Sequence, residues 1–223
     1  MTSDEYGTER NEFKGKRIKR IRMHEMEEAA KVYGTNPDGT PKLKLHWFGE
    51  IDGYLPFNKD VLSRLQRLIL DLQPDVVFGP DSFFTLDYHV DHMRAGWLIY
   101  FAIKTLPLSK ARHPLLFLYH SFNNNFFVPV KALSIQVSAW AKHRSQTTPL
   151  RNKLILPVRW LFNTFRRART GSTLAEGFRR VRFVAGENVL GKVSQRTFYR
   201  LVTKVNNGYK RSFYTPTPDQ LGL

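Results

Sequence analysis

The hydrophobic positions of this chain follow two periods, one typical of helices and one typical of strands. In four segments apolar side chains recur in a helical pattern, which predicts helices with one apolar face. Gly34 follows the first of these segments as a C-cap, and Asn58 opens the second as an N-cap. The predicted helices cover residues 16–33, 58–72, 91–106 and 131–144.

Short apolar runs between the helices predict strands. Residues 42–48 alternate polar and apolar side chains, whereas 76–78 and 115–120 are continuous runs of β-forming residues. Such continuous runs between helices are typical of buried parallel strands. Residues 123–130 are expected to form a turn followed by a strand, and Pro129, which cannot donate a backbone hydrogen bond, places this strand at an edge of the sheet. Helices that alternate with strands indicate βαβ units, an α/β fold class and a parallel sheet.

The composition excludes several classes of protein. The chain of 223 residues has no cysteine, which excludes disulfides and thiolate zinc sites, so a metal would need His, Asp or Glu ligands. No apolar run reaches the roughly 20 residues of a spanning helix. The polar N-terminus resembles neither a signal peptide nor a transit peptide. We therefore expect a cytoplasmic protein with one sizeable core.

The net charge of +16 lies mainly in the C-terminal part of the chain. Residues 142–211 carry 17 Lys and Arg against Glu176 and Glu187, whereas the first half is nearly balanced. This basic region would attract an anionic membrane surface, a nucleic acid or an acidic partner. Residues 154–169 mix aromatic and basic side chains, which suits either an interfacial helix on anionic lipid or a helix that packs its apolar side on the domain. Nucleic acid is not expected, because no recognition motif accompanies the charge.

The stretch DYHVDH, residues 87–92, gathers two histidines and two carboxylates after a predicted strand. In an open parallel sheet, ligands bind beyond the carboxyl ends of the strands, which is where this stretch is expected to lie. Imidazole and carboxylate groups are zinc ligands, and a histidine beside Asp91 would also suit acid-base chemistry. A third interpretation is a polar loop in which Asp91 caps the following helix. The residue pattern leaves all three open.

Six short motifs follow one another along the chain. No single motif is specific, but the series in this order resembles the LmbE and PIG-L family of zinc-dependent N-acetylglucosaminyl de-N-acetylases, from about residue 1 to about residue 183. The motifs are R-x-x-E with a later glycine (22–34), G-E-I-D-G (49–53), Q-P-D-V-V-F-G-P-D (73–81), H-V-D-H-M-R-A (89–95), A-K-H-R-S-Q (141–146) and A-E-G-F-R (175–179).

The resemblance implies a Rossmann-like α/β sandwich with zinc at the carboxyl ends of the strands. By the family's H-P-D-H motif, in which Val90 here replaces the proline, His92 would be a metal ligand. His89 would lie beside the scissile amide and stabilise the oxyanion or act as the acid, and Asp91 would orient a histidine. The reaction implied is metal-assisted hydrolysis of an acetamide.

The resemblance also implies two substrate-binding residues. Arg22 would contact polar groups of the sugar, although a helix arginine is often a solvated partner of Glu25 or Glu28. Asp52 would line the sugar pocket, although Asp-Gly is also an ordinary turn. The expected partner is therefore an N-acetylated amino-sugar substrate.

One departure from the family pattern is serious. The family's other two metal ligands and its general base come from an A-H-P-D-D-E motif, which this chain lacks. The chain resembles a family member that starts about one βαβ unit late, and the remaining histidines do not follow the family's ligand pattern. We expect an α/β domain over 1–146 without its first strand, completed by a basic C-terminal region over 147–223.

Two functions follow from these expectations. The first is a zinc-dependent deacetylase that removes acetyl from an N-acetylglucosamine-containing glycan or glycolipid, impaired in this form because the ligand set is incomplete. The alternative is a non-catalytic or degenerate member of the same fold that binds sugar or membrane.

Overall fold

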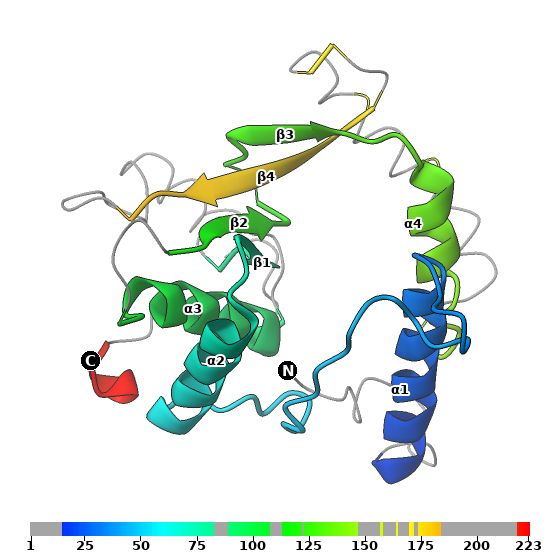
Figure 1. Cartoon of the computed structure of the whole chain (residues 1–223). Coiled ribbons are helices and arrows are strands. Elements are labelled where there is room, and N and C mark those ends of the chain that lie inside the picture. Colours follow the sequence, from blue (N-terminus) through cyan, green and yellow to red (C-terminus); the bar gives the residue numbers. More distant parts are fainter. Residues whose placement is uncertain are drawn as a thin grey trace, which may run out of the picture. The chain divides into compact units, whose positions relative to one another are not determined.

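The structure is a computed structural model in which the chain forms two compact units (Figure 1). The first unit comprises Met1–Tyr54 with Phe127–Glu176, and the second comprises Leu55–Phe126 with Gly177–Leu223. The structure describes residues 15–82, 89–107, 113–121, 123–146, 157, 164, 170–171, 174–183 and 218–223.

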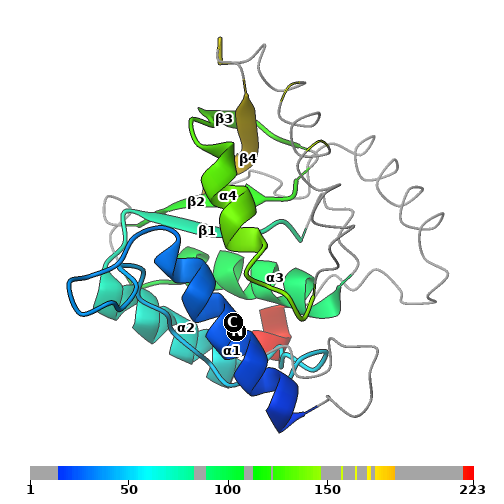
Figure 2. The same ribbon diagram turned by 90° about the vertical axis from the view of Figure 1, so that its right-hand side faces the viewer.

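The first unit is built around helix α1, Lys16–Lys31, and helix α4, Leu133–Trp140. The two helices pack against each other and follow one another along a common line (Figures 1 and 2). The sequence predicted both, but α4 is shorter than expected at both ends. After Trp140 the chain makes tight turns, in which His143 N–H donates to the Trp140 carbonyl at 3.1 Å.

The strand predicted at 42–48 does not form, and that prediction is wrong. Leu43 and Trp47 are exposed, and the bridge between Thr35 and Pro41, beside which Lys42 N–H donates to the Gly34 carbonyl at 2.9 Å, does not continue as a strand. An alternating pattern marks one face for burial, but a strand also needs a neighbour that accepts its backbone hydrogen bonds. This segment has the alternating pattern, but it is not part of a strand.

The second unit holds the parallel part of the sheet. Strand β1, Val76–Pro80, pairs in parallel with β2, Leu115–Tyr119, as the apolar runs predicted. Helix α3, Val90–Lys104, packs on both strands, and helix α2, Lys59–Leu72, packs on α3 (Figure 1). A helix therefore connects β1 to β2, which is the βαβ unit that the sequence indicated.

A helix cap and a short 3-10 helix belong to the second unit. The Asn58 side chain accepts a hydrogen bond from Val61 N–H at 3.0 Å, which confirms the predicted N-cap of α2. The 3-10 helix η4, Pro218–Leu221, packs near α2 and buries Leu221.

The sheet is mixed, not purely parallel, and this corrects the sequence prediction. Strand β4, Ala175–Val181, runs antiparallel to β2, and the strand order is β1-β2-β4-β3. Strand β3, Phe126–Pro129, lies at one edge, as Pro129 predicted. The sequence does not predict a strand at 175–181. Every second side chain of this strand is buried, but one of the buried residues is the charged Arg179. A buried arginine conceals the alternation from which a strand is normally recognised.

Strand β1 is not buried on both faces as predicted. Val76 and Phe78 are exposed, at the other edge of the described sheet. Their face carries stacked and edge-to-face aromatic rings, with Phe78 5.7 Å from Phe117 and 5.3 Å from Phe178 between ring centroids. The opposite face, where Gly79 meets Ile99 of α3, is the buried one.

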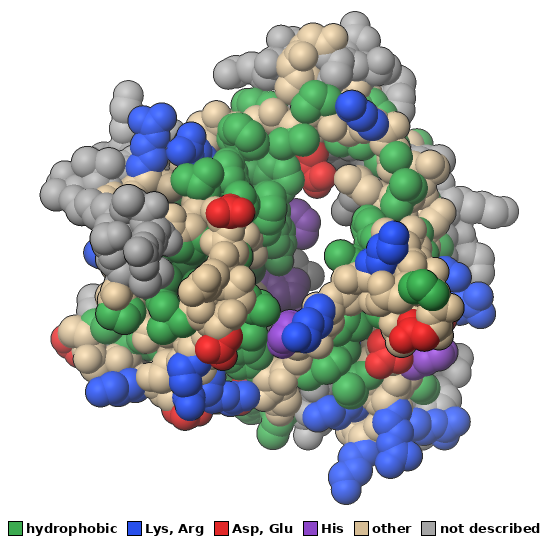
Figure 3. All heavy atoms as spheres, viewed as in Figure 1, with side chains coloured by type: hydrophobic (Ala, Val, Ile, Leu, Met, Phe, Trp, Pro, Cys, Tyr) green, Lys and Arg blue, Asp and Glu red, His purple; other side chains and the backbone are tan. Residues whose placement is uncertain are grey.

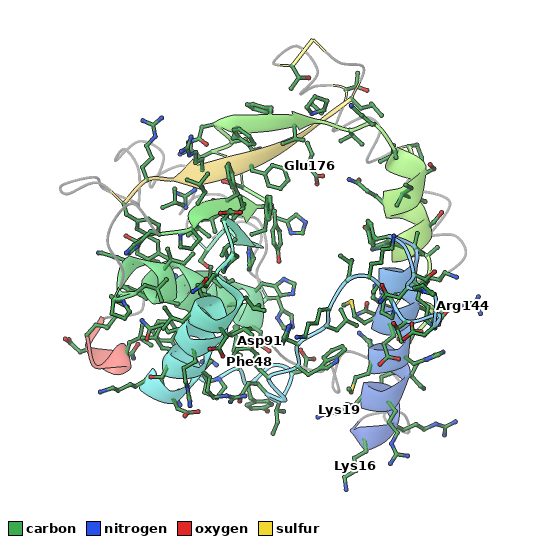
Figure 4. The ribbon with its side chains drawn as sticks, in the orientation of Figure 1. Lys16, Lys19, Phe48, Asp91, Arg144 and Glu176 are labelled. Atoms are coloured by element: carbon green, nitrogen blue, oxygen red, sulfur yellow. The ribbon has the colours of Figure 1, made fainter. Side chains whose placement is uncertain are left out.

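The membrane expectations fall partly outside the described residues. Within the part of the chain that the structure describes, no helix is long and apolar enough to span a membrane. The basic and aromatic segment 154–169 lies outside it, apart from two isolated positions, so its role on lipid stays a prediction. Among the described residues, basic side chains gather at the N-terminal end of α1, where Lys16 and Lys19 lie (Figures 3 and 4).

Candidate active-site residues

The histidines of the DYHVDH stretch lie together at the start of α3. His89 is the N-cap residue of this helix, and its ring centroid lies 4.9 Å from that of His92. Ser82, two residues beyond β1, donates its hydroxyl to the Met93 carbonyl at 2.5 Å. The first turn of α3 is thereby fixed near the carboxyl end of β1, which is where the sequence pattern predicted it. The first two residues of the stretch, 87 and 88, lie outside the described residues.

Asp91 is a buried residue of the first helical turn, only 3% exposed, and is not the N-cap. Its Oδ1 accepts the Leu55 N–H at 3.1 Å, and Arg94 Nη1 donates to the Leu55 carbonyl at 2.8 Å (Figure 4 labels Asp91). Two side chains of α3 thus bind both polar groups of one buried backbone unit. The polar-loop interpretation, with Asp91 as helix cap, is wrong. A carboxylate in a first turn also interacts favourably with the helix dipole.

The described residues do not fit the metal that the resemblance implies. A catalytic zinc needs about three protein ligands, and no group of three His, Asp or Glu side chains within residues 15–82 or the later described ranges could hold a metal ion. His92 is exposed beside His89, but Asp91 directs an oxygen to the Leu55 backbone. The role of His92 as a ligand stays a prediction.

A buried ion pair, absent from the predicted site, lies at the end of β1. Asp81 accepts from Arg179 Nε at 2.8 Å and from Arg179 Nη2 at 3.0 Å, and both side chains are nearly inaccessible to solvent. The pair joins two of the sequence motifs, Q-P-D-V-V-F-G-P-D and A-E-G-F-R. Sequence reasoning missed it because a charged residue is rarely expected in the interior of a strand.

A second feature that sequence reasoning missed is the backbone at the end of β2. His120 follows this strand with φ at 57°, in the left-handed region that residues other than glycine seldom adopt. Its ring lies edge-on to Tyr119, with centroids 5.0 Å apart. Nothing in the sequence marks this position beyond its place directly after an apolar run.

In the first unit, Arg22 and Asp52 are both buried, at 5% and 6% exposure, together with Glu25. Burial lowers the pKa of the Arg22 guanidinium, and the charges of Glu25 and Asp52 partly raise it again. Arginine nevertheless stays protonated in proteins. A solvated Arg22 is therefore excluded, and the structure brings the two predicted sugar-binding residues into electrostatic contact. Asp52 is buried although it also forms the expected Asp-Gly turn.

Glu25 connects α1 to the segment that follows α4. Its Oε1 accepts from Ser145 N–H at 2.7 Å and its Oε2 accepts from the Ser145 hydroxyl at 2.6 Å. His143 lies two residues earlier. Burial lowers the His143 pKa, the Glu25 charge raises it, and the Arg22 charge lowers it. The motifs R-x-x-E and A-K-H-R-S-Q, distant in sequence, thus meet within the first unit.

Three comparisons place these features among known proteins. Residues 1–103 match the PIG-L family, described as GlcNAc-PI de-N-acetylase. Over 199 residues the chain is 24% identical to the diacetylchitobiose deacetylase of Thermococcus kodakarensis, covering 83% of this chain and 71% of that protein.

Solved structures share the fold. The N,N'-diacetylchitobiose deacetylase of Pyrococcus horikoshii, complexed with an inhibitor, superposes with a TM-score of 0.70 at 25% identity, covering 82% of this chain and 71% of that one. The 4-carboxy-2-hydroxymuconate hydratase of Pseudomonas putida gives a TM-score of 0.66 at 17% identity, covering 85% of each chain. The similarity to the PIG-L family thus extends over residues 1–103, and the α/β fold of the chain matches that of the Pyrococcus deacetylase.

Proposed function

We propose that this protein removes the acetyl group from an N-acetylglucosamine-containing glycan or glycolipid. In this reaction the oxygen of water bonds to the acetamide carbonyl carbon, the C–N bond breaks, and acetate and a free amine leave. The family match and the deacetylase names of two relatives support the substrate class. The observation that carries the proposal is the His89 and His92 pair at the start of α3, near the carboxyl end of β1.

His89 is the proposed acid. Its imidazole N–H can donate to the leaving amine or stabilise the tetrahedral oxyanion. Asp91 holds the first turn of the helix that carries the two histidines, through its hydrogen bond to the Leu55 backbone. A fixed helix start keeps the acid within reach of the substrate, on which general acid catalysis depends.

Arg22 and Asp52 are the proposed sugar-binding residues of the first unit. Guanidinium donors suit the carbonyl and hydroxyl oxygens of an acetylated sugar, and a carboxylate suits its hydroxyl groups. Both side chains are buried, so a bond to the sugar would form in a region of low dielectric, where it is stronger than in water.

Zinc is the cofactor that the resemblance implies, and the described residues do not supply the ligand set for it. No catalytic step is therefore assigned to a metal. Loss of supporting residues around a metal already reduces activity about 10- to 100-fold, and loss of ligands reduces it further. We expect turnover more than about 100-fold below that of the Thermococcus enzyme assayed beside it.

The test is acetate release from N,N'-diacetylchitobiose in buffer with and without Zn²⁺. We expect His89→Ala to lose most of the activity of the wild type, by about 100-fold or more, because it removes the proton donor. His24→Ala is the matched control, since His24 is exposed on α1, and its activity should not change. Equal acetate release by wild type and His89→Ala would contradict the role of His89.

A second candidate is a non-catalytic member of this fold that binds acetylated sugar. It is favoured by the absence of a three-residue metal group within the described ranges. The fold itself does not decide, because a hydratase shares it. Saturable binding of N,N'-diacetylchitobiose without any acetate release, with and without Zn²⁺, would establish the second candidate.

A further inference from the structure

Glu25 occupies a buried position one helical turn after Arg22 in α1. Residues three apart on a helix lie on the same side of it, so Glu25 and Arg22 are neighbours on α1. Glu25 is only 8% exposed, and its charge acts on Arg22. A buried guanidinium needs a nearby negative charge, because an uncompensated charge in the interior is strongly unfavourable.

The Glu25 carboxylate cannot turn freely. Both of its oxygens accept hydrogen bonds from Ser145, one from the backbone N–H at 2.7 Å and one from the hydroxyl at 2.6 Å. Hydrogen bonds to a charged acceptor are among the stronger ones in proteins. The turn that carries Ser145 follows α4, and Arg144 of this turn lies beside α1 (Figure 4). The negative charge beside Arg22 is thereby held in place by a segment 120 residues away in sequence.

We propose that Glu25, held by Ser145, is a positioning residue that orients Arg22 for the acetylated sugar. The inference rests on the proposed function and extends it to a residue that does not itself touch the substrate. Arg22 presents a planar fork of donors, which binds well only when its plane is fixed. Without the fixed carboxylate, Arg22 adopts other rotamers and its bonds to the sugar are lost in part of the population.

The role predicts a specific kinetic signature. Glu25→Gln keeps the shape of the side chain and removes its charge, so it should raise the KM for N,N'-diacetylchitobiose about tenfold, which corresponds to one charged hydrogen bond. The kcat should stay within about twofold of the wild type, because the reacting amide is not touched. Ser145→Ala should raise the KM less than Glu25→Gln does, since the backbone donor remains. Ser145→Thr should have the wild-type KM, because threonine keeps the hydroxyl.

Glu28→Gln is the matched control. Glu28 lies one turn further along α1, where its Oε1 accepts from Lys31 Nζ at 2.7 Å at the surface. This substitution removes the same charge from the same helix and should leave KM unchanged. Thermal unfolding of each variant identifies any loss of fold, and the Ser145 pair keeps the test valid if Glu25→Gln unfolds.

The outcomes separate the two levels of the proposal. If the wild type binds N,N'-diacetylchitobiose without hydrolysing it, the Kd replaces the KM in every comparison. If Glu25→Gln has the same KM (or Kd) as Glu28→Gln, or if its kcat falls at unchanged KM, the positioning role is overturned while the proposed function stands. A wild type that neither binds nor hydrolyses the disaccharide overturns the proposed function itself, before any variant is compared.

Discussion

The two units of this protein bury charge in different ways. In the second unit, Asp81 and Arg179 form a closed pair in which one carboxylate accepts two hydrogen bonds from one guanidinium. In the first unit, Arg22 lies among two carboxylates, and the Glu25 carboxylate binds Ser145 through both oxygens. A closed pair serves the fold, because its donors and acceptors already satisfy each other. A cation near a carboxylate that is held by another segment suits the binding of a polar ligand.

The largest expected effect comes from breaking the closed pair. Asp81→Asn leaves Arg179 as a buried charge without its counter-charge, so the free energy of unfolding should fall by about 3–5 kcal/mol. Urea denaturation measures it. The double variant Asp81→Leu with Arg179→Met replaces the pair by apolar groups and should recover most of this loss. A cost below about 1 kcal/mol for Asp81→Asn would show that the pair is not structural and would remove the contrast with the first unit.

A smaller loss is expected from the packing beside this pair. A Cβ at Gly96 of α3 would overlap the Ser82 hydroxyl and the Pro80 carbonyl, so Gly96→Ala forces a shift of the helix. Overpacking of this kind costs about 1–3 kcal/mol. Adding Ser82→Ala should return part of it, because one of the two obstacles is then removed. An unfolding midpoint in urea that equals the wild-type midpoint would contradict this close approach of α3 to β1.

The smallest expected effect is a pH dependence in the first unit. Burial lowers the His143 pKa below its usual value of 6.5, so the native state binds this proton more weakly than the unfolded chain. The stabilisation is therefore complete above about pH 6.5 and is lost as the pH falls through the lower, native pKa. His143→Gln should lose less stability than the wild type between pH 7.5 and pH 5. If urea denaturation gives the same loss of unfolding free energy for the wild type and for His143→Gln over this pH range, the burial of His143 is contradicted.

Local signals in the sequence were enough for much of the fold. The cap at Asn58, the edge position of Pro129 and the apolar runs of β1 and β2 each depend on chemistry within a few residues. Strand β4 was missed because the partner of Arg179 lies 98 residues away in sequence. The segment 42–48 was mistaken for a strand because alternation does not reveal whether a neighbour exists. The periodicity of apolar residues does not reveal which segments pair over long distances in the sequence.

For the candidate site too, the sequence revealed the residues that are close together along the chain but not their distant partners. His89, Asp91 and His92 were found because they are adjacent in sequence and follow a strand. The Leu55 backbone as the partner of Asp91, and Ser145 as the partner of Glu25, were not foreseen, since only the folded chain brings these groups together. Both partners fix a side chain in place, so the missed contacts concern the rigidity of the site more than its chemistry.

The most direct measurement is the simultaneous quantification of acetate and free amine from N,N'-diacetylchitobiose incubated with the full chain. Hydrolysis of an acetamide yields the two products in equal amounts, and the proposed function predicts slow, equimolar formation of both that His89→Ala abolishes. Saturable binding of the disaccharide with neither product formed, in buffer with or without Zn²⁺, would contradict deacetylation and leave a sugar-binding protein on a deacetylase fold.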